Sequence, residues 1–156
     1  MVTPREYPDR PIVGVGAVIV DAAGGRVVLV RRGSPPLQGE WSLPGGVVEL
    51  GETLRAAAER EALEETGLIV KAGEVLVVLD RIIPGRDGAV QYHYVLIDFL
   101  CAVEGGELRA GGDAADVCWA SESELAEHKL EQPAIEVIKK AFTTEARRCG
   151  DYSGSE

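Results

Sequence analysis

The sequence is short of positive charge, of cysteine and of long apolar runs. Lys and Arg number 16 against 26 Asp and Glu, so the formal net charge is −10. A protein that binds the nucleic-acid backbone needs a basic stripe, and this balance argues against that class. The three cysteines, Cys101, Cys118 and Cys149, are an odd number without metal-like spacing. They favour reduced thiols in a cytoplasmic protein.

No apolar run approaches the ~18 residues that a membrane span needs. The opening residues, MVTPREYPDRP, also lack the apolar core of a signal peptide or anchor. We therefore expect no membrane partner. The chain does have the length of one domain, 156 residues, of which 46% are hydrophobic and 27% charged. That balance is typical of a globular protein in water.

Apolar runs separated by glycine-rich turns predict a single domain over residues 1–146, followed by a disordered tail at 147–156. The expected elements are strands at 12–20, 26–32, 74–83, 90–102 and 117–120, a short helix from SESEL and a last helix from about Pro133. The first two strands flank DAAGG and form a hairpin. Because helices and hairpins alternate irregularly, we expect an α/β (α+β) fold in which helices cover a curved mixed sheet.

The segment GGVVELGETLRAAAEREALEETGL, residues 45–68, is rich in carboxylates. Thr53 is the expected N-cap of a helix over 54–66, and Gly67 its left-handed end. Glu61, Glu64 and Glu65 follow the i, i+3, i+4 spacing that makes helical side chains neighbours. Like charges placed in this way repel one another and destabilise the helix, so a positive partner is expected among them.

An acidic helix usually presents its carboxylates to solvent. At ~100° per residue, however, Glu61 and Glu65 point the same way as Leu54 and Ala58, with Glu64 at the edge of that arc. We therefore expect these acids on the side that packs. Carboxylates there either take up protons or bind a cation.

All-oxygen ligands suit Mg²⁺ or Mn²⁺ rather than zinc. The glycine pair at 45–46 lets a backbone carbonyl approach the same ion without a side chain in the way. A divalent metal, a bound water and an adjacent carboxylate make a hydrolytic site. The residues alone thus predict a metal-dependent phosphoanhydride hydrolase.

Gly46, Glu52 and REALEETGL (60–68) match every fixed position of the Nudix box, which spans residues 46–68. Only Ala62 departs from it, where the pattern prefers a larger aliphatic. The order of hairpin, WSLPGG, box, paired long strands and last helix is also similar to a MutT-like Nudix domain over most of the chain. The resemblance implies a Nudix-type α/β/α sandwich with a curved mixed β-sheet.

The resemblance implies roles for particular residues. It gives Mg²⁺ or Mn²⁺ as the cofactor, held by Glu61, Glu64, Glu65 and the backbone carbonyl of Gly45. Arg60 orients the acids by pairing with Glu52, so Glu61, Glu64 and Arg60 form the catalytic set. The family does not fix the general base, and the candidates here are Glu61 within the box and Glu107, Asp113 or Asp116 outside it.

Four further residues are candidates for substrate binding. Arg31 and Arg32 end the second strand, either as an ordinary exposed terminus or as a guanidinium clamp on phosphate. Arg32 also sits where related Nudix enzymes carry a substrate-facing Arg. Trp41 is a core or rim residue or a platform for a base, and Arg81 is a weaker candidate.

The segments DRIIPGRDGAVQYHYVLIDFL and EGGELRAGGD look like those of Nudix members labelled ADP-ribose pyrophosphatases. We therefore expect cleavage of the pyrophosphate bond of a nucleoside diphosphate linked to another moiety, with a small nucleotide as partner and a homodimer left open. One alternative is a nucleoside triphosphate pyrophosphohydrolase. The other is a non-catalytic nucleotide sensor, against which the full set of box acids argues. The sequence leaves the leaving group, the metal preference and the oligomeric state undetermined.

Overall fold

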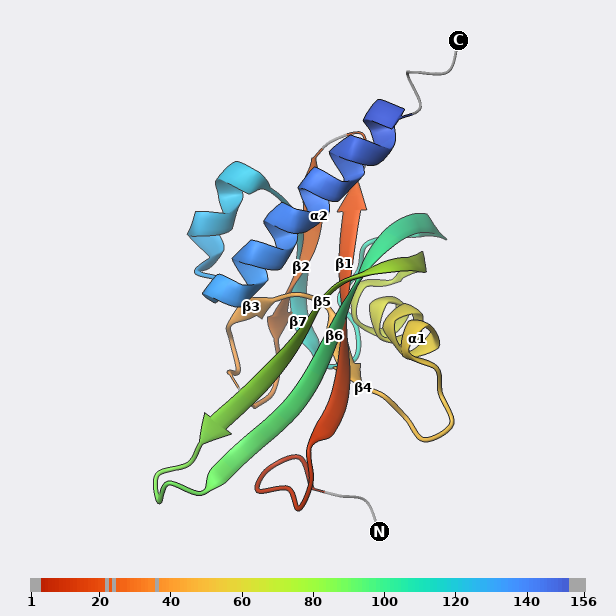
Figure 1. The fold of residues 1–156 in the computed structure, drawn as a ribbon. Helices are drawn as coiled ribbons and strands as arrows, with labels where there is room; N and C mark the ends of the chain where they lie inside the picture. Colours follow the sequence, from red (N-terminus) through yellow and green to blue (C-terminus); the bar gives the residue numbers. More distant parts are fainter. Residues whose placement is uncertain (1–3, 22, 24, 36, 152–156) are drawn as a thin grey trace.

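Seven strands form one curved mixed sheet in the part of the chain that the structure, a computed structural model, describes: residues 4–21, 23, 25–35 and 37–151 (Figure 1). The strands are β1 (Ile12–Asp21), β2 (Arg26–Arg32), β3 (Trp41–Ser42), β4 (Gly45–Val47), β5 (Leu68–Pro84), β6 (Val90–Gly106) and β7 (Ala114–Ser121). The helices are α1 (Leu54–Thr66), the 3₁₀ helix η1 (Glu122–His128) and α2 (Gln132–Asp151).

Helices cover both faces of the sheet, and each face has its own hydrophobic core. On one face, α1 packs Ala57, Ala58 and Ala62 against strand residues that include Phe99. On the other face, η1 and α2 contribute residues such as Leu125 and Ile138, and Figure 1 shows α2 lying across the sheet there. The predicted α/β/α arrangement with a curved mixed sheet is confirmed.

The central strand β1 has its longest pairing with β6, not with its neighbour in sequence. The two run parallel from the Ile12↔Tyr94 pair to the Val20↔Ala102 pair. The predicted hairpin of β1 and β2 is present, but only its turn end pairs, through Val20↔Val27 and Asp21↔Arg26. Beyond those pairs the two strands separate.

The segment from Trp41 to Val47 spans this separation. Its first part, β3, pairs with β2 at Arg31↔Trp41, and its last part, β4, pairs with β1 at Gly16↔Gly45. Between them the Pro44 carbonyl accepts a hydrogen bond from the Ala17 N–H at 2.8 Å. We call this segment the seam. It brings WSLPGG to the point where the sheet opens.

Several predicted boundaries change in the structure. Strand β5 begins earlier than expected, because the glycine-containing break near residue 73 is an irregularity within the strand rather than its start. Strand β6 continues to Gly106, four residues past its expected end. The last helix continues to Asp151, past the expected domain end at residue 146. The remainder of the predicted tail, 152–156, lies outside the described residues.

Within the described ranges, no helix is both long enough and apolar enough to span a membrane.

Candidate active site

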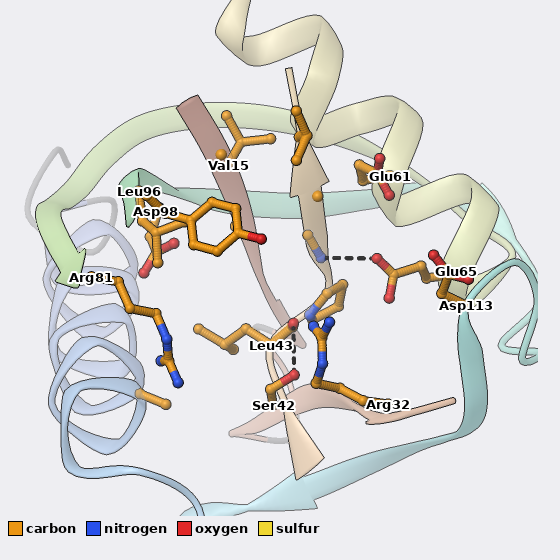
Figure 2. Close-up of a pocket in the computed structure, with 18 of the residues that line it drawn as sticks. Val15, Arg32, Ser42, Leu43, Glu61, Glu65, Arg81, Leu96, Asp98 and Asp113 are labelled. Atoms are coloured by element: carbon orange, nitrogen blue, oxygen red, sulfur yellow. Dashed lines mark hydrogen bonds between the residues drawn. The ribbon is translucent and has the colours of Figure 1, made fainter. Parts of the chain in front are cut away.

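A pocket of about 460 Å³ lies where β1 and β2 separate. Figure 2 shows it between α1, which carries Glu61 and Glu65, and an opposite wall that includes Arg81, Leu96 and Asp98. Seam residues and Arg32 line the space between the two walls. The pocket therefore places the acidic helix opposite residues of β5 and β6, with β1, β2 and the seam between them.

Helix α1 is held in place by its ends and by its small residues. The Thr53 hydroxyl accepts a hydrogen bond from the Ala56 N–H at 3.1 Å, and Gly67 ends the helix with φ 74°, as the sequence predicts. Ala57, Ala58 and Ala62 are fully buried, so the helix lies close to the sheet. The acids that follow the same face are carried to the edge of the pocket.

The three box acids differ in exposure. Glu65 is 8% exposed and Glu61 is half-buried, which agrees with the prediction that these two lie on the packed side. The Glu64 side chain is 52% exposed, and Leu54, expected on the packed face, is exposed. Leu54 is in the first turn of α1, where Arg55 and Ala56 are exposed as well. The buried face of α1 therefore begins after the first turn and runs along the side of the helix that carries Glu61 and Glu65.

Arg60 is the positive partner that the structure provides for Glu61 and Glu64. Its guanidinium donates to both carboxylate oxygens of Glu52, at 2.7 and 2.9 Å, and to Glu61 at 2.8 Å. It also reaches the Val47 carbonyl at 3.1 Å and lies 3.4 Å from Glu64. The hydrogen bonds from Arg60 lower the pKa of Glu52, and those to the acids raise the pKa of Arg60 itself. The expected Arg60–Glu52 pair is thus formed.

Glu61 and Glu65 form a carboxylate pair that is partly buried from solvent. Burial raises the pKa of Glu61. Burial and then the charge of Glu61 raise the pKa of Glu65 to about 8, against a hydrogen bond from the Gly45 N–H at 3.2 Å. A Cβ at Gly46 would overlap the Glu61 carboxylate, so this first glycine of the box makes room for that acid beside the backbone.

This donor set fits a hard divalent cation. Burial raises the pKa values of these two adjacent carboxylates even though Arg60 donates a hydrogen bond to Glu61, so a further positive charge would stabilise them as anions. Mg²⁺ takes one or two protein carboxylates while keeping several waters. No cluster of three or more His, Cys, Asp or Glu side chains is arranged for a metal among the described residues, because Glu61 and Glu64 turn toward Arg60. The carbonyl of Gly45 stays a predicted ligand, since the contact found here is through its N–H.

The candidate substrate residues are not all brought together. Arg32, Trp41 and Arg81 line the pocket, whereas Arg31 is exposed and lies outside its lining. Successive strand residues point to opposite faces, so Arg32 turns inward and Arg31 outward. The Arg31 guanidinium lies 6.0 Å from the centre of the Trp41 ring.

Comparison with known proteins decides the family, since a model of the NUDIX domain matches residues 10–141. The chain belongs to the Nudix family. An ADP-ribose pyrophosphatase of Methanocaldococcus jannaschii is 42% identical over 107 residues, which cover 69% of this chain and 60% of that protein. A candidate 8-oxo-dGTP diphosphatase of Mycobacterium tuberculosis is 42% identical over 115 residues, 73% of this chain and 75% of that one.

Solved structures agree with the family. The MutT NUDIX hydrolase of Burkholderia pseudomallei superposes with a TM-score of 0.69 at 29% identity, covering 85% of this chain and 98% of that one. The prediction that the chain is a Nudix domain is therefore confirmed.

Within this Nudix domain, the three outside candidates for the general base are separated by position. Asp113 lines the pocket, and its backbone carbonyl accepts a hydrogen bond from the Gly33 N–H at 2.7 Å. Glu107 and Asp116 are exposed and lie outside the pocket lining. Asp113 is thus the one outside acid of the three that faces the same space as the Nudix helix.

Sequence reasoning missed several residues of the pocket. Glu131, just before α2, pairs with both terminal nitrogens of Arg81, at 2.5 and 2.9 Å, so that guanidinium is already held. Asp98 and Leu96 line the wall opposite the acids. The signal for Asp98 was present in the sequence, because an isolated carboxylate interrupts the apolar run YVLIDFL of a buried strand.

Proposed function

We propose that this Nudix domain hydrolyses the pyrophosphate bond of a nucleoside diphosphate linked to another moiety, with an ADP-ribose-like substrate, and depends on Mg²⁺ or Mn²⁺. The observation that carries the proposal is the pocket itself. One wall presents the carboxylate pair Glu61 and Glu65, and the other presents a larger, partly apolar surface from β5, β6 and the start of α2. A phosphate group and an organic moiety thus each have a matching surface.

Arg32 supports the placement of phosphates between the two walls. It lines the pocket, and its charge acts on Glu65, whose pKa it lowers against the larger effects of burial and of Glu61. A phosphate bound here could contact the Arg32 guanidinium and the cation proposed at Glu65 at the same time. Trp41 is at the pocket edge, where a planar ring suits stacking on a base.

In the proposed reaction Glu61, Glu65 and the Gly45 backbone would hold the cation, with Glu64 able to join them from its exposed position. When bound there, the cation would polarise a phosphoryl oxygen and lower the pKa of a bound water. Arg60 keeps Glu61 aligned by bridging it to Glu52. A base removes the proton of the attacking water, and Glu61 and Asp113 are the candidates that line the pocket.

The second candidate function is pyrophosphohydrolysis of a nucleoside triphosphate. It is favoured by the similarity to the Mycobacterium tuberculosis protein, over about three-quarters of both chains. A sensor that binds nucleotide without cleaving it is a third candidate function.

We also propose a cytoplasmic location, because Cys101 and Cys118 are free thiols.

The test is a panel of ADP-ribose, NADH, dinucleoside polyphosphates and nucleoside triphosphates, each assayed with Mg²⁺ and with Mn²⁺. We expect AMP and ribose 5-phosphate from ADP-ribose. Glu61→Gln and Glu65→Gln should each lower kcat by roughly a hundredfold, while the exposed Glu104→Gln should not. Cleavage of triphosphates alone, to a monophosphate and pyrophosphate, would favour the second function, and nucleotide binding without turnover would favour the sensor.

A further inference from the structure

Asp98 is a buried carboxylate in the proposed substrate pocket that the chemistry above does not use. It is on β6, is 7% exposed and lines the pocket. Figure 2 shows it on the wall with Leu96 and Arg81, across the pocket from Glu61 and Glu65. Its neighbours on the same face of β6 are Tyr94 and Leu96, which also line the pocket. A negative charge is therefore placed on a mostly apolar wall.

The fold makes specific room for this carboxylate. Gly16 of β1 is the direct partner of Asp98 in the parallel pair of strands. A Cβ at Gly16 would overlap the Asp98 Oδ1 and lie 3.0 Å from its Cγ. Any other residue at position 16 would thus displace the side chain. The glycine is needed because the Asp98 carboxylate folds back over β1, where the pocket opens.

Among the residues that the structure describes, the Asp98 carboxylate has no hydrogen-bond or ion-pair partner. Arg81, on the same wall, has both terminal nitrogens on Glu131. Loss of hydration raises the pKa of Asp98 to about 6. No buried side-chain oxygen is sealed away without a partner in the described residues, so the Asp98 oxygens still reach the pocket space.

Buried carboxylates are nearly always hydrogen-bonded, because an unpaired one costs free energy. A wall that offers two unpaired acceptor oxygens is complementary to a group with N–H or O–H donors. That group is not a phosphate, since phosphate oxygens and a carboxylate repel each other. It belongs to the part of the substrate that extends away from Glu61 and Glu65.

We propose that Asp98 is a specificity-determining residue whose carboxylate accepts hydrogen bonds from an amino or hydroxyl group of the non-phosphate part of a nucleotide. The proposal rests on the binding half of the proposed function, that the pocket is a nucleotide site. A base amine and a sugar hydroxyl share this donor chemistry. A site built to pair with a donor rejects an analogue that lacks it, because the buried acceptor is then left unpaired.

The experiment measures dissociation constants by calorimetry, with Mg²⁺ present, for nucleotides that differ by one donor. The pairs are GDP and IDP for the 2-amino group, ADP and purine riboside diphosphate for the 6-amino group, and ADP and 2′-deoxy-ADP for the ribose hydroxyl. We expect the unmodified protein to favour the donor-bearing member of at least one pair by about 10- to 100-fold. Asp98→Asn and Asp98→Ala should reduce that preference to near onefold.

The matched control is Asp80→Asn, which removes an exposed carboxylate from β5 outside the pocket lining and should keep the preference. The proposal is overturned if no pair is discriminated, if Asp98→Asn discriminates as the unmodified protein does, or if no nucleotide binds. Turnover is scored separately. If ADP-ribose is hydrolysed but the binding preference does not depend on Asp98, the proposed function stands and this inference is rejected. If the preference depends on Asp98 but no nucleotide is hydrolysed, this inference stands and the proposed hydrolysis is rejected.

Discussion

At the scale of single residues, the site is built on carboxylates whose surroundings differ sharply. Glu52, just before α1, is stabilised as an anion by Arg60. Glu65, in the last turn of α1, is buried beside Glu61 and has its pKa raised to about 8. Two acids of one short segment thus prefer opposite charge states. The difference comes from burial, which raises the pKa of Glu65, and from the Arg60 guanidinium, whose hydrogen bonds lower the pKa of Glu52.

The raised pKa of Glu65 predicts how stability changes with pH in protein stripped of metal by a chelator. The folded state binds this proton more tightly than the unfolded chain, whose value is near 4.5. The group's stabilising contribution is therefore complete below about pH 4.5 and is lost as the pH rises through about 8. Glu65→Gln, which stays neutral, should lose less stability than the unmodified protein between pH 5 and pH 8.

Urea unfolding with chelator at several pH values across this window provides the measurement. Glu61 and Asp98 also have raised pKa values, so the comparison is the difference between the two proteins, not the slope of either one. Glu104→Gln serves as the exposed control and should follow the unmodified protein. A difference that is the same at pH 5 and pH 8 would contradict the assignment.

At the scale of elements, α1 and the seam position the site, and sequence predicts the first far better than the second. Caps, box spacing and the 3.6-residue period are local, so the bounds of α1 and its acids are readable in the chain. The seam depends on long-range pairing. WSLPGG contains no local sign that Trp41 pairs with β2 while Gly45 pairs with β1. For the same reason Asp98 and its partner Gly16 were not connected by sequence reasoning.

Gly67 ends α1 in a conformation that a side chain strains, which gives a prediction for this element. A Cβ there would also overlap the Glu107 carbonyl. We expect Gly67→Ala to lower the unfolding free energy by at least about 1–2 kcal/mol from the left-handed backbone alone, and Tm by several degrees. Gly88→Ala is the matched control, because Gly88 has φ 81° with nothing within 4 Å of its Cβ position.

Calorimetric melting of both variants separates the two contributions. A larger loss for Gly67→Ala than for Gly88→Ala measures the cost of moving the Glu107 backbone. Unchanged melting of Gly67→Ala would show that the end of α1 tolerates a side chain and does not fix the position of the acids.

At the scale of the whole molecule, the net negative charge affects how metal binding by the acidic helix must be tested. The chain carries a formal charge of −10, so a general attraction for cations must be distinguished from a site. A divalent ion that binds only the folded protein stabilises it by about 2.7 kcal/mol at a hundredfold excess over Kd. For a domain of this size that corresponds to a rise of several degrees in Tm.

We expect this rise with Mg²⁺ or Mn²⁺ in the unmodified protein and its loss in Glu61→Gln/Glu65→Gln. The charge-matched pair Glu104→Gln/Glu127→Gln, both exposed and outside the pocket, should keep it. Equal loss in the two double variants would mean that the ion is a diffuse counter-ion, and the site as described would not exist.

The parallel pairing of β1 with β6 has a consequence for the order in which the molecule is assembled. β1 leaves the ribosome before β6, and Gly16 meets Asp98 only after about 80 further residues have been made. Glu131 follows later still. Pairings so distant in sequence are slow to form. The Nudix box is synthesised well before the pocket can form. A nascent chain therefore contains the acids of α1 before β6 has been made to complete the opposite side of the pocket.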